Sequence, residues 1–152
     1  MIMEFEYSFA PTTMEQIAAF ENKYKLLLPT NYKSFLLDNN GGKTVKRRFD
    51  TTDETITSSI MLFLPLSQEE EQSLEQYHVK YNLGGIVPSN LLPIGIDPAE
   101  SLICISLHEE GVGSVYLCDM NYYHEDNELK NEHIKLIAKS FHGFLTSLYI
   151  LQ

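Results

Sequence analysis

The sequence predicts an α+β fold, with helices toward both ends of the chain and a group of β-strands between them. Apolar residues recur every three or four positions over 12–38 and again over 137–148, a spacing that is typical of amphipathic helices. Three short apolar segments, over 91–96, 101–107 and 114–118, are separated by turn-forming residues. These segments are therefore expected to be successive strands.

The first expected helix begins at Thr12 or Thr13 and ends near Lys25. Thr13 stands three residues before Gln16, the spacing at which two side chains can bond reciprocally to the backbone at a helix start. The buried face of this helix is expected to carry Ile17, Phe20 and Tyr24.

A second helix is expected to open at Pro29 and Thr30 and to stop in the sequence Asn39-Asn40-Gly41-Gly42. Gly41 and Gly42 tolerate the left-handed backbone that a helix end often requires, whereas a side chain there adds strain. The apolar stripe of this helix is formed by Tyr32, Phe35 and Leu36.

The segment 43–59 is polar and is expected to form either a long loop or an edge hairpin. Its basic cluster at 46–48 could contact a phosphate, but the acidic residues that follow favour a solvated loop. The next five residues, 60–64, are all apolar, which predicts a strand that is buried on both faces and halted by Pro65.

A third helix is expected after Ser67, which is followed three residues later by Glu70 in a second capping-box pattern. The three consecutive glutamates of 69–71 favour the positive end of a helix dipole. The inner face is expected to carry Leu74, Tyr77 and Tyr81, and the helix to end at Asn82 and Gly84-Gly85.

A last helix is expected after the three strands, with Ser140 as its cap or as a hydroxyl at the core edge. Its apolar positions at helical spacing are Ile137, Phe141, Phe144, Leu145 and Leu148. The segment from His133 to Ala138 fits either the first turns of this helix or a preceding strand, because its apolar residues match both periods.

The net charge of −10 is unevenly distributed along the chain. Residues 49–132 contain sixteen Asp and Glu against only Lys80 and Lys130, a net charge of −14, whereas the remainder is positive. Such a segment repels phosphates and attracts basic surfaces, which argues against direct contact with nucleic acid and for a cationic protein partner. The alternative is an acidic surface that only keeps the protein soluble.

The remaining composition indicates one cytoplasmic domain over residues 1–152, with no repeat or linker. The chain opens without a basic leader and a long apolar stretch, and no later run approaches the ~20 apolar residues of a membrane span. Cys104 and Cys118 both lie in apolar strand-like segments, so they are expected to be buried free thiols that lie near each other if their strands pair. The sequence does not specify an oligomeric state.

The spacing of the histidines does not indicate a metal site. His108-Glu109 begins like a zinc-protease motif, but Val112 stands where the second histidine is needed. His124, His133 and His142 are nine residues apart, which alternates the faces of a single helix instead of converging on one.

Nucleophile and phosphate-binding motifs are incomplete as well. Ser140 and His142 lie near each other without the turn that presents an exposed nucleophilic serine. Gly84-Gly85 and Gly111-x-Gly113 lack the further residues of phosphate and dinucleotide loops, so they are expected to be turns. No catalytic residue, cofactor or metal is therefore expected.

Two acidic clusters form the candidate partner-binding surface, one in a predicted hairpin tip and one in the tyrosine-bearing segment after the last of the three strands. Exposed tyrosines supply contact area at little entropic cost, and nearby carboxylates steer a basic partner. The alternative is a solvated loop whose tyrosines pack back on the core. The predicted partner-binding residues are Glu109, Glu110, Asp119, Tyr122, Tyr123, Glu125, Asp126 and Glu128.

Two separated parts of the sequence resemble the SUKH superfamily, over about Thr12 to Leu148. The most specific pieces are Leu28-Pro29, Tyr32, Phe35 and Asn40-Gly41-Gly42, then Ile94-Gly95-Ile96-Asp97, followed by Ser140-Phe141. The resemblance implies a twisted, mainly antiparallel central sheet with helices packed against it, and a binding module instead of an enzyme. The residues expected to serve this fold are Pro29, Gly41, Gly42, Gly95, Asp97, Ser140 and Phe141. The turn Asp97-Pro98-Ala99-Glu100 departs from the glycine-bearing turn that is common in the family.

Bacterial SUKH members are mostly immunity proteins for secreted toxins, frequently nucleases. The resemblance thus implies an immunity protein that binds a cognate toxin with a basic nuclease domain and masks its active site. Cellular relatives act in cell-wall regulation, so a non-enzymatic protein-interaction scaffold of that type is the alternative. The toxin-facing surface varies among members, and the resemblance does not locate it.

Overall fold

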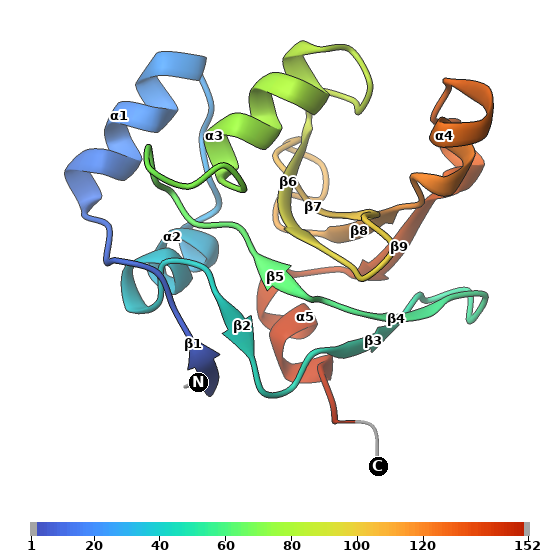
Figure 1. The fold of residues 1–152 in the computed structure, drawn as a ribbon, viewed down its shortest axis with the longest axis horizontal. Helices are drawn as coiled ribbons and strands as arrows, with labels where there is room; N and C mark the ends of the chain where they lie inside the picture. Colours follow the sequence, from blue (N-terminus) through green and yellow to red (C-terminus); the bar gives the residue numbers. More distant parts are fainter. Residues whose placement is uncertain (1–2, 151–152) are drawn as a thin grey trace.

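A central five-stranded antiparallel sheet, in the order β5-β6-β7-β8-β9, organises the α+β fold that the sequence predicts (Figure 1). The computed structural model describes residues 3–150, apart from the side chains of His124 and Asp126. Its strands are β1 (Phe5–Tyr7), β2 (Lys43–Thr44), β3 (Arg48–Asp50), β4 (Thr57–Ser59), β5 (Leu62–Phe63), β6 (Leu91–Ile96), β7 (Leu102–Ser106), β8 (Val115–Cys118) and β9 (Ile134–Ala138). Its helices are α1 (Met14–Tyr24), α2 (Thr30–Asp38), α3 (Leu74–Tyr77), the π-helix η1 (His78–Leu83), α4 (Asn121–Asp126), the 3₁₀ helix η2 (Asn131–His133) and α5 (Phe141–Ser147).

Both N-terminal helices form where the sequence predicts them. Thr13 caps α1 by accepting a hydrogen bond from the Gln16 amide at 3.2 Å, and the helix ends at Lys25 in left-handed backbone (φ 56°). The second helix, α2, begins directly after Pro29, whose carbonyl accepts a hydrogen bond from the Lys33 amide at 3.0 Å. Of the apolar residues expected on the inner faces, Ile17, Phe20, Tyr32, Phe35 and Leu36 are buried and Tyr24 is partly buried.

Gly41 and Gly42 serve a close approach between strands and not the helix end itself. The α2 helix stops at Asp38, and Gly42 then exchanges backbone hydrogen bonds of 2.9 and 2.8 Å with Phe63 in β5. Gly42 has a φ of +120°, and a Cβ atom there would lie 2.2 Å from the Tyr7 carbonyl oxygen in β1. A side chain at this position would therefore push β1 away from β2.

The start of the third helix differs from the sequence prediction. Ser67 bonds only locally, to the Glu69 amide, and residues 67–73 are not helical. Ser73 is the actual cap of α3, because its hydroxyl accepts the Gln76 amide at 3.2 Å. The side-chain pattern at 67–70 was therefore wrong as a helix start, although Leu74 is buried as expected.

The two faces of the central sheet have different roles. One row of paired residues runs across all five strands: Phe63, Gly95, Ile103, Leu117 and Lys135. The ring of Phe63 packs on Phe35 of α2 and on Phe144 of α5, with centroids 4.9 and 6.3 Å apart. This face therefore forms the core with α2 and α5, and the neighbouring residue on each strand points to the opposite face.

The segment from His133 to Ala138 contains a strand, β9, which pairs antiparallel with β8. Ser140 then caps α5, its hydroxyl accepting the Gly143 amide at 2.9 Å. Phe141 follows at once and places its ring 5.2 Å from that of Tyr32 and 5.1 Å from that of Phe35. Ser140 and Phe141 thus join β9, α5 and α2 in one core.

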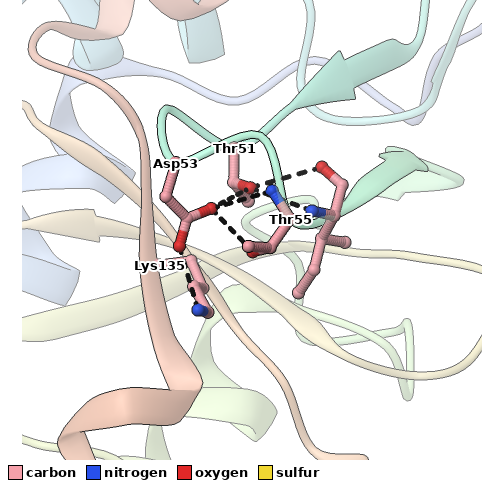
Figure 2. A network of polar contacts seen from close by, with 5 residues as sticks. Thr51, Asp53, Thr55 and Lys135 are labelled. Carbon is pink, nitrogen blue, oxygen red and sulfur yellow. Dashed lines mark hydrogen bonds and ion pairs between the residues drawn. The ribbon is translucent and has the colours of Figure 1, made fainter.

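The sequence predicts either a long loop or an edge hairpin for the polar segment 43–59. The structure shows the hairpin, in which β3 pairs with β4. Its loop is attached to β9, because Lys135 Nζ donates to Asp53 Oδ2 at 2.9 Å (Figure 2). The Thr52 amide also donates to the Leu136 carbonyl, at 2.8 Å. Hydrogen bonds from Thr55, then from Lys135 and Thr51, hold the pKa of Asp53 well below its usual range.

The apolar run 60–64 forms a shorter strand than predicted, since β5 spans only Leu62–Phe63. Met61 is 47% exposed, so burial on both faces was wrong at this position. No helix between residues 3 and 150 combines the length and the apolar character that crossing a bilayer requires.

Candidate protein-binding surface

The two predicted acidic clusters lie at opposite ends of strand β8. The hairpin tip that carries Glu109 and Glu110 precedes the strand, and the segment with α4 follows it (Figure 1). The four residues of β8 span roughly 13 Å at about 3.3 Å per residue. The structure therefore does not gather the predicted residues into one patch.

A groove of about 490 Å³ extends from Glu110 in the hairpin tip, past Tyr116 in β8, to Asn131 and Ile134 at the start of β9. Tyr116 and Ile134 directly precede Leu117 and Lys135, which lie in the row of Phe63, so both point to the face opposite the α2–α5 core. The residues that line the groove come from β6, β7, β8, β9 and the loops beside them: Pro88, Asn90, Leu91, Ser106, His108, Glu110, Tyr116, Asn131 and Ile134.

Within the described structure, four polar side chains of the groove have no internal partner, whereas Ser106 and His108 each accept a backbone amide. Among the described residues, neither the amides of Asn90 and Asn131 nor the Glu110 carboxylate and the Tyr116 hydroxyl take part in a side-chain hydrogen bond. By contrast, the structural amide of Asn82 donates to three backbone carbonyls, at 2.9 to 3.4 Å. The groove therefore offers donors and acceptors that a partner could use.

The hairpin tip places Glu110 at the groove and Glu109 beside it, both exposed. The Glu110 amide donates to His108 Nδ1 at 3.2 Å, so this ring nitrogen acts as an acceptor. Val112, in the same tip, is 48% exposed and adds apolar surface. The tip thus combines two carboxylates with a side chain that can pack against a partner.

The segment after β8 divides its two tyrosines between surface and core. Tyr122 is 43% exposed, and its ring stacks on the imidazole of buried His133 with centroids 3.8 Å apart and planes 3° from parallel. Tyr123 is partly buried and packs against the core. Tyr122 therefore has the exposure that a partner contact would need, and Tyr123 packs back on the core as the alternative describes.

The acids of this segment also differ in their surroundings. Asp119 is half-buried and accepts hydrogen bonds from the amide and the side chain of Asn121 at 3.2 and 3.0 Å, which fixes the start of α4. Glu125 and Glu128 are exposed. The side chain of Asp126 lies outside the described part of the structure.

Most of the negative charge of 49–132 is not neutralised within the described side chains. Lysines pair with two of its carboxylates, Lys135 with Asp53 and Lys23 with Glu75, each at 2.9 Å. Glu109, Glu110, Glu125 and Glu128 have no ion pair with another described residue, so their field extends into solvent.

Asp97 has a structural place at the turn between β6 and β7. Its buried carboxylate accepts the amides of Ala99 and Ser101 at 2.9 and 2.8 Å and the Ser58 hydroxyl at 2.9 Å. These bonds close the turn and attach it to the β3–β4 hairpin, while the following Glu100 adopts left-handed backbone (φ 65°). The carboxylate of Asp97 therefore uses its hydrogen-bonding capacity within the fold.

The buried cysteines lie on the same sheet face as the groove. Cys104 in β7 and Cys118 in β8 are free thiols with sulfur atoms 3.8 Å apart, close together as expected. Burial raises the pKa of the Cys104 thiol well above its usual value. Among residues 3–150, no three described His, Cys, Asp or Glu side chains are placed to hold a metal together.

Sequence reasoning missed most of the groove. Leu91, Ser106, Tyr116 and Ile134 meet only through strand pairing, and no local motif marks them. The available signal was the alternation within β8, where the polar ring of Tyr116 interrupts an otherwise apolar strand.

A five-stranded antiparallel sheet with α2 and α5 packed on one face defines an α+β domain. Its opposite face, called the outer face below, carries the groove with the Glu110 carboxylate at one end. Residues 11–147 match the model of the SMI1 / KNR4 family (SUKH-1), and the chain belongs to this family. The predicted SUKH membership is thus confirmed. No curated protein matches the chain.

Proposed function

We propose that this protein is an immunity protein that binds a cognate secreted toxin and masks its active site. The toxin would be a nuclease, because a nuclease needs a basic groove to hold phosphates and an acidic protein can occupy that groove. We propose binding as its whole activity, without turnover of a substrate. Its place of action would be the cytoplasm.

What supports this function is the exposed, unpaired charge of Glu109, Glu110, Glu125 and Glu128 on a SUKH-1 domain. Carboxylates at both ends of β8 can steer a basic partner onto the sheet face between them. Tyr122, whose ring is held by the stack on His133, adds a rigid apolar contact near one end.

Co-expression with the toxin encoded beside this gene tests the function directly. The parent is expected to rescue growth, and the combined variant Glu109→Lys, Glu110→Lys, Glu125→Lys, Glu128→Lys to lose rescue. The matched control changes four other exposed acids by the same charge: Glu69→Lys, Glu70→Lys, Glu71→Lys and Glu100→Lys. Circular dichroism and a urea melt confirm that both variants are folded.

Equal rescue by both variants would place the interface elsewhere on the domain. Failure of the parent to bind or neutralise any toxin encoded beside it would argue for the alternative, a protein-interaction scaffold of the cell-wall-regulator type. A change in toxin activity without a stable complex would contradict binding as the whole activity.

A further inference from the structure

We infer that the groove on the outer sheet face receives an arginine side chain of the partner, held between the Tyr116 ring and the Glu110 carboxylate. This inference rests on the proposed function, since it specifies how a basic toxin would be anchored. It concerns a site that includes one predicted partner-binding residue, Glu110, and residues that strand pairing brings to it.

The walls of the groove suit the long stem of a cationic side chain. Leu91 in β6 and Ile134 in β9 provide apolar surface on strands that lie on either side of β8, which carries Tyr116, and Pro88 adds further apolar lining. Arginine buries its methylene stem along apolar surface while its head reaches polar groups. The volume of about 490 Å³ lies within the usual range of about 300 to 1,000 Å³ for ligand sites.

The polar groups of the groove match a guanidinium better than an ammonium. A guanidinium has five N–H donors in a planar fork that stacks on aromatic rings and binds carboxylates with two hydrogen bonds. The groove offers the ring of Tyr116, the unpaired carboxylate of Glu110 and the side-chain oxygens of Asn90 and Asn131. An ammonium would use fewer of these acceptors and would not stack.

The charge of the groove selects a cation over an anion. Its lining contains Glu110 but no Lys or Arg, and Glu109 adds a second carboxylate at the same tip. A phosphate or carboxylate ligand would therefore be repelled.

The first test measures the affinity of the cognate toxin domain for groove variants by isothermal titration calorimetry. Glu110→Gln and Tyr116→Leu are each expected to weaken binding about tenfold or more, as desolvated interface anchors do. Tyr116→Phe, which keeps the ring, and Glu100→Gln, which removes an acid outside the groove lining, are expected to stay within about twofold of the parent. Urea melts exclude loss of the fold in each variant.

A second test separates the groove from the proposed function. The probe is the peptide Gly-Ser-Arg-Ser-Gly, compared with the same peptide carrying citrulline, the neutral isostere of arginine, by NMR titration of the backbone amides. The arginine peptide is expected to shift the amides of Glu110, Tyr116 and Asn131, and the citrulline peptide to leave them unchanged. This test does not require the toxin.

The two results have different consequences. Toxin binding that is unaffected by both Glu110→Gln and Tyr116→Leu overturns the inference and leaves the immunity function intact. Equal shifts from the two peptides, or no shift of the groove amides at millimolar arginine peptide, overturn it as well. A parent that binds no toxin, while the arginine peptide still shifts the groove, overturns the proposed function and keeps the cationic site.

Discussion

At position 42 a side chain of any size would meet the backbone of another strand. Gly42→Ala is expected to lower the free energy of unfolding by at least about 2 kcal/mol, because φ is +120° and the added Cβ would lie 2.2 Å from the Tyr7 carbonyl oxygen. Urea denaturation measures this change. Gly85→Ala is the matched control, since Gly85 also has a positive φ but no atom within 4 Å of the added Cβ.

The control is expected to cost only about 1 kcal/mol, the price of left-handed backbone alone. Equal losses at the two positions would mean that the approach of β1 to β2 does not constrain position 42. The sequence predicts Gly42 as a helix-end residue, whereas the structure places it against β1. The position of β1 does not follow from a local sequence pattern.

Phe141 is a second residue on which the fold depends. Its ring is buried and lies against the rings of Tyr32 and Phe35. Phe141→Ala is expected to destabilise the protein by about 3–5 kcal/mol through the cavity it leaves. Met14→Ala, at a position that is 53% exposed, is expected to change stability by less than about 0.5 kcal/mol in the same urea melt. Comparable losses would contradict the core position of Phe141.

At the scale of the elements, the structure shows that Ser73, and not Ser67, is the cap of α3. Ser73→Ala is expected to cost about 1 kcal/mol, because its hydroxyl caps the helix and is fully buried. Ser67→Ala removes only a local bond to the Glu69 amide and is expected to cost less than half as much. A larger loss of stability from Ser67→Ala than from Ser73→Ala in thermal or urea melts would instead favour a helix that starts at Ser67.

The β3–β4 loop carries the clearest pH dependence among the described elements. The pKa of Asp53 is lowered on folding, so the stabilisation from its charged form is present above the unfolded pKa, near 3.8. It is lost as the pH falls from there toward the lower folded pKa. Asp53→Asn is therefore expected to reduce stability near pH 7 and to weaken the acid-side loss below about pH 4.

Urea melts between pH 2 and pH 7 measure this difference, with Glu54→Gln as the control for an exposed neighbouring acid. Identical pH profiles for Asp53→Asn and the parent would show that the contacts of Figure 2 do not stabilise the loop. Because Asp53 is exposed, the effect is expected to be small and to decrease with added salt.

For the whole molecule, the unpaired carboxylates predict how a basic partner would associate. The association rate with the cognate toxin is expected to fall steeply between about 50 and 500 mM NaCl, because steering acts over a Debye length of about 10 Å at 0.1 M salt. The dissociation rate is expected to change much less, since packed contacts set it. Surface plasmon resonance at several salt concentrations measures both rates. A salt-independent association rate would contradict a charge-steered interface.

The sequence predicted the parts of the fold that local chemistry determines. Caps at Thr13 and Ser140 and the apolar spacing of α1, α2 and α5 depend on residues that are close in the chain. Ser67 shows the limit of such local prediction, because the same capping pattern forms no helix there. The Leu74 amide instead bonds to the Pro65 carbonyl, and the helix begins only at Leu74.

Most residues of the candidate groove could not be predicted from local sequence patterns. The groove joins Leu91, Ser106, Tyr116 and Ile134 through a register that two irregular pairings shift, one between β6 and β7 and one between β8 and β9. A single-residue slip would turn each of these side chains to the other face. Charge, by contrast, can be read from composition, and it is the basis on which a basic partner is proposed.

The cysteine pair makes the protein its own reporter of unfolding. Cys104 and Cys118 are inaccessible in the folded sheet, so a thiol reagent can modify them only after the central strands separate. The rate of labelling under native conditions then measures how often β7 and β8 open. A bound toxin that clamps the outer face of these strands would slow that labelling, and no added fluorophore would be needed to detect the complex.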